Sequence, residues 1–185
     1  MHTTLLSDWV RAAWIIASCA VAWVHLRHVW AMTGQRRYWH VGHVMMALGM
    51  AYMYLPAAAQ VIPDVVAATL FTAAAAASAG AFLLMWGRGG GLHLLWLLSA
   101  AEMAVMAYMV LPMNAHFTLL SHVLAGYLVL VGVSWVAGAR YSRYVLRLNE
   151  PVLPTGSAEF RPAAMALRLS LATMAASMAY MLVAM

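Results

Sequence analysis

The tetrapeptide Met-Ala-Tyr-Met occurs three times in this sequence, and its copies end at Met53, Met109 and Met181. A further side chain of interest stands four residues before each copy, and positions i, i+4 and i+7 share one face of a helix. Three helices carrying these copies would each present a stripe of similar side chains. Stripes that met around one axis would form three stacked rings. The ring residues are Met46, Met50, Met53, Glu102, Met106, Met109, Met174, Met178 and Met181.

The ring residues suggest a copper site, because a thioether is a soft, neutral ligand that needs no deprotonation. Soft thioethers select Cu(I) over zinc, magnesium and calcium. Three thioethers from three helices would form a trigonal Cu(I) site, and an ionised Glu102 would offset the charge of the ion. A carboxylate within a membrane span is itself a hypothesis of function. Two alternatives stay open: methionines that only fill gaps between helices, and a protonated Glu102 bonded to a neighbour such as Ser99.

Histidines occur in two pairs at spacing i, i+3, on either side of Gly34. His25 and His28 end the first apolar segment, and His40 and His43 begin the second. Folding the chain about Gly34 would place His28 level with His40 and His25 level with His43. Converging imidazoles suit copper, zinc, iron or haem. The sequence therefore predicts a four-histidine cluster at the inner end of this hairpin, where an ion would be accepted or released.

Further histidines stand at the outer end of the fifth apolar segment. We expect His122, together with His116 and Met113, to recruit the ion there. The alternative for His116 is that of an imidazole anchored at the membrane interface. The tyrosine within each tetrapeptide is expected in the aromatic belt at the outer membrane surface.

The composition indicates that lipid surrounds these segments, because 66% of the 185 residues are hydrophobic and only 8% are charged. A soluble domain could not cover so much apolar surface. A helix needs about 20 apolar residues to cross the hydrocarbon core. On this basis the predicted spans are 9–31, 40–60, 64–86, 92–113, 117–138 and 163–184.

We therefore predict one all-α integral membrane domain over residues 1–185, with six transmembrane helices arranged as three helical hairpin repeats at 9–60, 64–113 and 117–184. Arginines gather at the first, third and fifth connections, the last being the loop 139–162. The positive-inside rule makes these connections cytoplasmic and places both termini outside, for a multi-pass protein of the plasma membrane. The arginines form no single basic patch, so nucleic acid is not an expected partner. The expected partners are the lipid bilayer, a metal ion and a possible membrane protein.

Motifs of common enzyme classes are absent from the sequence. It contains no Gly-x-Ser-x-Gly, no P-loop and no His-Glu-x-x-His. The Glu-x-x-His spacing of di-iron bundles is missing too. Cys19 is the only cysteine, so one chain cannot form a thiolate metal cluster. We therefore do not expect an enzyme.

Two resemblances rest on the methionine pattern. The segment His43-x2-Met46-x3-Met50-x2-Met53, followed by Pro56, resembles an uncharacterised family of Met/His-rich, multi-spanning actinobacterial membrane proteins, a domain of unknown function. That resemblance implies a fold class and no activity. The Met-x3-Met pairs resemble those of the eukaryotic Ctr copper transporters, in which three subunits stack methionine triads around a pore. Here three hairpins of one chain would imitate that trimer by convergence, and Glu102 departs from the pattern.

The first hypothesis is thus an integral membrane Cu(I)-binding protein that transports or delivers copper through stacked methionine rings. A second is a redox subunit that holds haem between His25 and His43 or between His28 and His40. A third is a non-catalytic accessory or assembly subunit of a membrane complex, with methionines used only for packing.

Overall fold

A computed structural model of the chain describes residues 7–86, 92–112, 115–137 and 160–184. These residues form six α-helices and one short 3-10 helix, and no strand occurs among them. The helices are α1 (Asp8–Ala31), α2 (Gln35–Met53), α3 (Asp64–Trp86), α4 (Leu92–Val110), α5 (Thr118–Ala137) and α7 (Phe160–Ala184), with the 3-10 helix η1 at Ala57–Ala59. The prediction of an all-α chain with six helices is confirmed.

The helix ends differ from the predicted spans where polar or proline residues intervene. α2 begins at Gln35, directly after Gly34, whose φ of 64° makes the turn from α1. It ends at Met53 instead of continuing to residue 60, because Pro56 has no backbone N–H to extend the helix. The loop expected at 139–162 lies outside the described residues up to 159, and its last three residues belong to α7.

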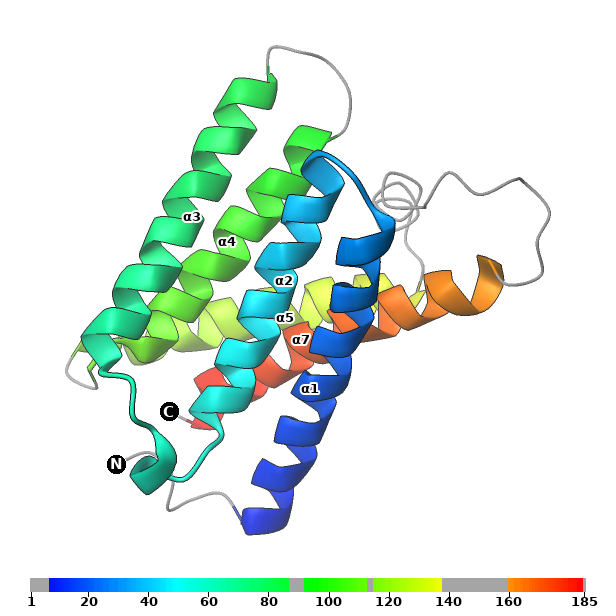
Figure 1. The fold of residues 1–185 in the computed structure, drawn as a ribbon. Helices are drawn as coiled ribbons and strands as arrows, with labels where there is room; N and C mark the ends of the chain where they lie inside the picture. Colours follow the sequence, from blue (N-terminus) through cyan, green and yellow to red (C-terminus); the bar gives the residue numbers. More distant parts are fainter. Residues whose placement is uncertain (1–6, 87–91, 113–114, 138–159, 185) are drawn as a thin grey trace.

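The six helices pair as three hairpins: α1 with α2, α3 with α4, and α5 with α7. The second helix of each hairpin carries one tetrapeptide, and these three helices, α2, α4 and α7, all contact one another. α1 packs against α7 as well. In Figure 1, α5 (yellow) and α7 (orange to red) run across the other four helices. The methionine-bearing helices therefore meet at the centre, but the third hairpin is inclined to the first two.

The surface of the described residues is largely apolar. Large hydrophobic side chains are exposed along α3 and α5, for example Leu83, Leu84, Leu119 and Leu130. Four helices are long and apolar enough to cross a membrane: α1, α3, α5 and the part of α7 from Met165 to Ala184. The apolar part of α4, Leu94–Val110, is shorter, and α2 does not qualify. The chain is therefore compatible with a membrane protein, with four of the six predicted spans qualifying by their own length and composition.

The repeated tyrosines have a structural role that the sequence pattern did not predict. The Tyr52 hydroxyl accepts a hydrogen bond from the backbone N–H of Ile62 (2.6 Å) and donates to the carbonyl of the same residue (3.2 Å). Tyr108 bonds the N–H (2.9 Å) and carbonyl (3.2 Å) of Phe117 in the same way. Each tyrosine thus ties its helix to the segment just before the next one. Tyr180, on the last helix, instead packs its ring against Trp14.

Candidate functional site

Eight methionines form one buried cluster at the centre of the bundle, hereafter the methionine cluster. They come from α2, α4 and α7, and all are buried. The eight are Met46, Met50, Met103, Met106, Met109, Met174, Met178 and Met181. Met46, Met106 and Met178 have no exposed surface at all, so each of the three helices contributes at least one fully enclosed thioether.

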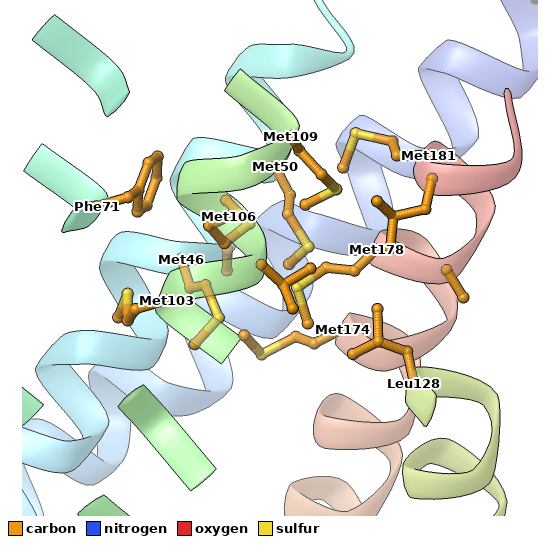
Figure 2. Close-up of a cluster of buried hydrophobic side chains, with 14 of the residues drawn as sticks. Met46, Met50, Phe71, Met103, Met106, Met109, Leu128, Met174, Met178 and Met181 are labelled. Carbon is orange, nitrogen blue, oxygen red and sulfur yellow. The ribbon is translucent and has the colours of Figure 1, made fainter. Parts of the chain in front are cut away.

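The methionine side chains are directed toward a common space. Figure 2 shows Met50, Met174 and Met178 reaching into the region between α2, α4 and α7, with Met109 joining them from α4. Phe71 of α3 lies at one side of the cluster and Leu128 of α5 at the other. Both flanking side chains are apolar and buried. On these two sides the methionine cluster is therefore bounded by apolar side chains.

The residues of the two inner predicted rings are all buried, and those of the outermost ring are not all buried. Met50, Met106 and Met178, the middle ring, are all enclosed. The deeper set of Met46, Glu102 and Met174 is also buried. The outermost set is less uniform, since Met53 is only half-buried while Met109 and Met181 are buried. The structure thus brings eight of the nine ring residues into the buried core and places Met53 at its margin.

Gly49 allows the helices to approach closely at the methionine cluster. A Cβ atom at this position would overlap the Phe71 ring and lie 3.2 Å from the Met106 methyl carbon. Because glycine has no Cβ, α3 and α4 can press against α2 at the level of Met50. The close packing of the cluster therefore depends on one missing side chain.

The four predicted histidines form a second group, hereafter the histidine cluster: His25, His28, His40 and His43. The rings of His28 and His40 stack with centroids 4.8 Å apart, and those of His25 and His43 do the same at 4.8 Å. His25 and His40 are joined by a hydrogen bond of 3.0 Å between their Nδ1 atoms. The pairing predicted by folding the chain about Gly34 is therefore confirmed.

Burial within the histidine cluster increases from the surface inward. His28 is partly exposed and bonds the Val24 carbonyl through Nδ1 at 2.7 Å. His25, His40 and His43 have no exposed surface. Because the stacked and bonded rings form a continuous series, imidazoles lead from the edge of the bundle to its interior.

Glu102 lies beside the histidine cluster. Its carboxyl group faces a histidine of α2 and not Ser99, the partner considered from the sequence. Its Oε2 atom is 3.4 Å from Nε2 of His43, and both side chains are buried. His43 in turn bonds the Trp39 carbonyl through Nδ1 at 2.9 Å. Glu102 therefore connects α4 to the histidines of α2, one helical turn before the methionine of the middle ring on α4.

Two residues of the histidine cluster's surroundings were not predicted. Trp39 is buried, and its ring centroid lies 4.0 Å from that of His43 and 4.9 Å from that of His40. Its position next to His40, and four residues before His43, is a local signal that could have indicated this contact. Ser170 of α7 meets His25 Nε2 at 3.2 Å. A separation of 145 residues leaves no local signal for that contact.

Two further predicted ligands, His122 and His116, bond backbone carbonyl groups. His122 is exposed on α5 and bonds the Thr118 carbonyl of its own helix at 2.7 Å. His116 bonds the Tyr108 carbonyl through Nε2 at 2.9 Å. Met113 lies outside the described residues. Among the side chains that the structure describes, no three of His, Cys, Asp and Glu are placed so that they could hold one metal ion.

Comparison with known proteins places the chain in a family without assigning a role. A family model described as "Domain of unknown function (DUF5134)" matches residues 35–185, well over half of the chain. The match includes α2, α4 and α7, and it begins after α1. Searches of curated proteins and of solved structures found no match.

Proposed function

The chain belongs to the DUF5134 family, and we propose that it is an integral membrane Cu(I)-binding protein that transports or delivers copper through its methionine cluster. The observation that carries the proposal is the gathering of eight buried methionines, from three mutually contacting helices, in one core cluster (Figure 2). The apolar outer surface favours a multi-pass position in the plasma membrane. In this proposal α2 and α4 also cross the membrane, each packed against the other helix of its hairpin.

The donor type favours Cu(I) as the cargo. Thioethers are soft and neutral, so they bind Cu(I) in preference to hard or borderline divalent ions. Phe71 and Leu128, which flank the methionines on two sides, are apolar and offer no oxygen or nitrogen ligand for a harder ion. A site of this kind can wait in a low-dielectric interior without the cost of a buried charge.

Packing alone is a less economical account of the methionine cluster. Ordering a methionine side chain costs about 1.5–2 kcal/mol of conformational entropy, against about 0.5–1 kcal/mol for leucine. Over eight residues the excess is on the order of 8 kcal/mol. Leucine would fill the same space with less loss, so the concentration of sulfur at one place supports a role for sulfur itself.

Two further features suit movement of the ion. Cargo must bind at several sites and at none too tightly, and the successive levels of thioethers satisfy both conditions. Glu102 lies four residues before Met106 on α4, close enough to offset the positive charge of an ion at the deeper level. No energy source is assigned, so the ion would move passively or be handed to a partner.

The test compares two sets of three Met→Leu changes in the full-length protein, purified in detergent after expression with copper. The first set is Met50→Leu, Met106→Leu and Met178→Leu, the middle ring. The control set is Met32→Leu, Met85→Leu and Met165→Leu, which removes as much sulfur outside the methionine cluster. These swaps conserve volume and apolarity, so folding should survive. Copper is measured by elemental mass spectrometry under reducing conditions.

We expect near-stoichiometric copper in the parent and the control set, and at least a tenfold loss in the middle-ring set. Equal copper content in all three proteins would show that the middle-ring methionines do not bind the ion. Protein free of copper throughout, with a Soret band, would move the proposal to haem and the histidines. Metal-free protein that retains a stable membrane partner would instead support an accessory subunit.

A further inference from the structure

Three polar atoms beside the methionine cluster are buried and have no hydrogen-bond partner among the described residues. They are Nε2 of His40, Nε2 of His43 and Oε2 of Glu102. An unsatisfied buried polar atom costs about 1–3 kcal/mol, so native structures seldom keep several together. The Cu(I) proposal uses only the charge of Glu102 and gives the two imidazole nitrogens no role. Their concentration on neighbouring turns of α2 and α4 therefore calls for a ligand of its own.

The hydrogen bonds of His43 determine which of its nitrogens is free. Nδ1 lies 2.9 Å from the Trp39 carbonyl oxygen, which can only accept. Nδ1 therefore carries the proton, and in the neutral ring Nε2 holds a lone pair. That lone pair faces the Glu102 carboxyl group at 3.4 Å. Metal-binding histidines are commonly held in this manner, with the second ring N–H donated to a carbonyl.

The same reasoning applies to His40 through a longer chain of bonds. The Ser170 hydroxyl donates to the Leu167 carbonyl at 2.8 Å. Nε2 of His25, 3.2 Å from that hydroxyl oxygen, therefore donates to it. Nδ1 of His25 must then accept from Nδ1 of His40 at 3.0 Å, which leaves a free lone pair on Nε2 of His40.

The separation of the two facing atoms fits a shared metal ion better than a direct hydrogen bond. A hydrogen bond between nitrogen and oxygen spans about 2.7–3.2 Å. A tetrahedral ion with bonds of about 2.0–2.2 Å to imidazole nitrogen and carboxylate oxygen separates these donors by about 3.4 Å. The observed distance from Nε2 of His43 to Oε2 of Glu102 is 3.4 Å.

We propose that His43 and Glu102 form a second metal site, which binds a divalent ion of the Zn(II) or Cu(II) class. Neutral imidazole and carboxylate are borderline and hard donors, so this site and the thioethers select different ions. The proposal goes beyond the copper function and does not depend on it. No third His, Cys, Asp or Glu of the described residues is placed to share this ion, so water or another exogenous ligand would complete its coordination.

The surroundings also suit exchange of the ion. Two protein ligands leave coordination positions open, as in sites that exchange ligands and unlike closed structural zinc sites. His28 stacks on His40 and is partly exposed, which gives an approach through imidazoles from the α1–α2 turn. The carboxylate lowers the net charge of a bound divalent ion from +2 to +1, which reduces the cost of burying it.

The test uses Co(II) as a visible probe on the full-length protein in detergent, followed by displacement with Zn(II). We expect one Co(II) per chain with d–d absorption bands, and binding at least tenfold weaker in Glu102→Gln and in His43→Gln. Asp64→Asn, which changes an exposed carboxylate at the start of α3, is the control and should bind as the parent does. The middle-ring set of Met→Leu changes should also bind Co(II) as the parent does, whether or not it has lost copper.

Failures of the two proposals are therefore distinguishable. Loss of copper with Co(II) binding retained is expected from the middle-ring set. Unchanged Co(II) binding in both Glu102→Gln and His43→Gln would overturn the second site and leave a buried ion pair in its place.

A measurement on the parent protein covers the case in which these variants do not fold. X-ray absorption at the zinc edge should show nitrogen and oxygen neighbours at about 2.0–2.2 Å, with the signature of imidazole. Sulfur neighbours at about 2.3 Å would place the ion among the methionines and overturn the second site.

Discussion

The two ends of α2 are equally buried but enclose side chains with different requirements. Towards its N-terminus, His40 and His43 are fully enclosed, and every ring nitrogen must be matched to a donor or an acceptor. Towards its C-terminus, Met46 and Met50 are just as enclosed and need only contact and volume. The side chains are therefore equally buried at both ends, but burial costs free energy at the histidine end unless hydrogen bonds are made, and it carries no such cost at the methionine end.

This contrast separates a region that depends on hydrogen-bond geometry from one that depends on shape. In the histidine cluster, the loss of one side chain leaves the hydrogen-bonding groups of its neighbours without partners. In the methionine cluster, three rotatable bonds per side chain allow neighbours to adjust. A change of similar volume should therefore be costly at one end of α2 and mild at the other.

The largest effect is expected from His25→Leu. This change removes the acceptor of His40 and the donor to Ser170 at once. We expect the free energy of unfolding to fall by about 2–4 kcal/mol, because a donor and an acceptor are left buried without partners. Unfolding in detergent followed by circular dichroism would measure it, with His122→Leu as control. A loss as small as that of the control would mean that the histidine cluster is not a connected network.

A smaller effect is expected from Gly49→Ala, which tests whether the methionine end depends on shape. The added Cβ would overlap the Phe71 ring and crowd the Met106 methyl group, so these side chains must shift within a packed core. We expect destabilisation by about 1–3 kcal/mol, the usual cost of overpacking. Gly126→Ala, where a Cβ meets nothing within 4 Å, is the matched control and should not be destabilised by overpacking.

Tyr108→Phe tests a bond at the outer margin of the methionine region. It removes the hydroxyl that bonds both backbone groups of Phe117. We expect a loss of about 0.5–1.5 kcal/mol and faster proteolysis of the α4–α5 connection. Tyr180→Phe should change neither, since Tyr180 ties down no following segment. Equal stability and equal proteolysis of the two variants would mean that the Tyr108 hydroxyl does not hold the connection, and would favour a role for the tyrosines in the aromatic belt.

The smallest effect on stability is expected from Met178→Leu. Met178 is as fully enclosed as His25, so the pair compares the two clusters directly. We expect a change within about 0.5 kcal/mol, because volume is conserved and the lower rotamer entropy of leucine offsets lost contacts. A loss approaching that of His25→Leu would show that the methionines are as tightly specified as the histidines.

Local spacing was enough to predict contacts within one hairpin. His25 and His43 stack as the i, i+3 pairs on either side of Gly34 predicted. The three stripes of ring residues also lie in the core as the repeat predicted, apart from Met53 at the margin. These predictions succeed because a tight turn and the period of a helix leave few ways to arrange neighbouring side chains.

Contacts between hairpins could not be predicted in the same way. Ser170 bonds His25 from α7, and Glu102 faces His43 from α4 and not Ser99 on its own helix. Both contacts depend on the angle and offset at which helices distant in sequence cross. Ridge-and-groove packing permits several crossing angles for one apolar face, so composition cannot choose among them.

The sequence alone determined that the chain would be helical and apolar, and which face of the three tetrapeptide-bearing helices would point inward. Those properties follow from side-chain chemistry and helical period, which act over a few residues. Only the tertiary structure decided that the third hairpin runs across the others, and that Glu102 meets His43 at 3.4 Å. These depend on how whole helical surfaces fit together, and that fit is a property of all six helices at once.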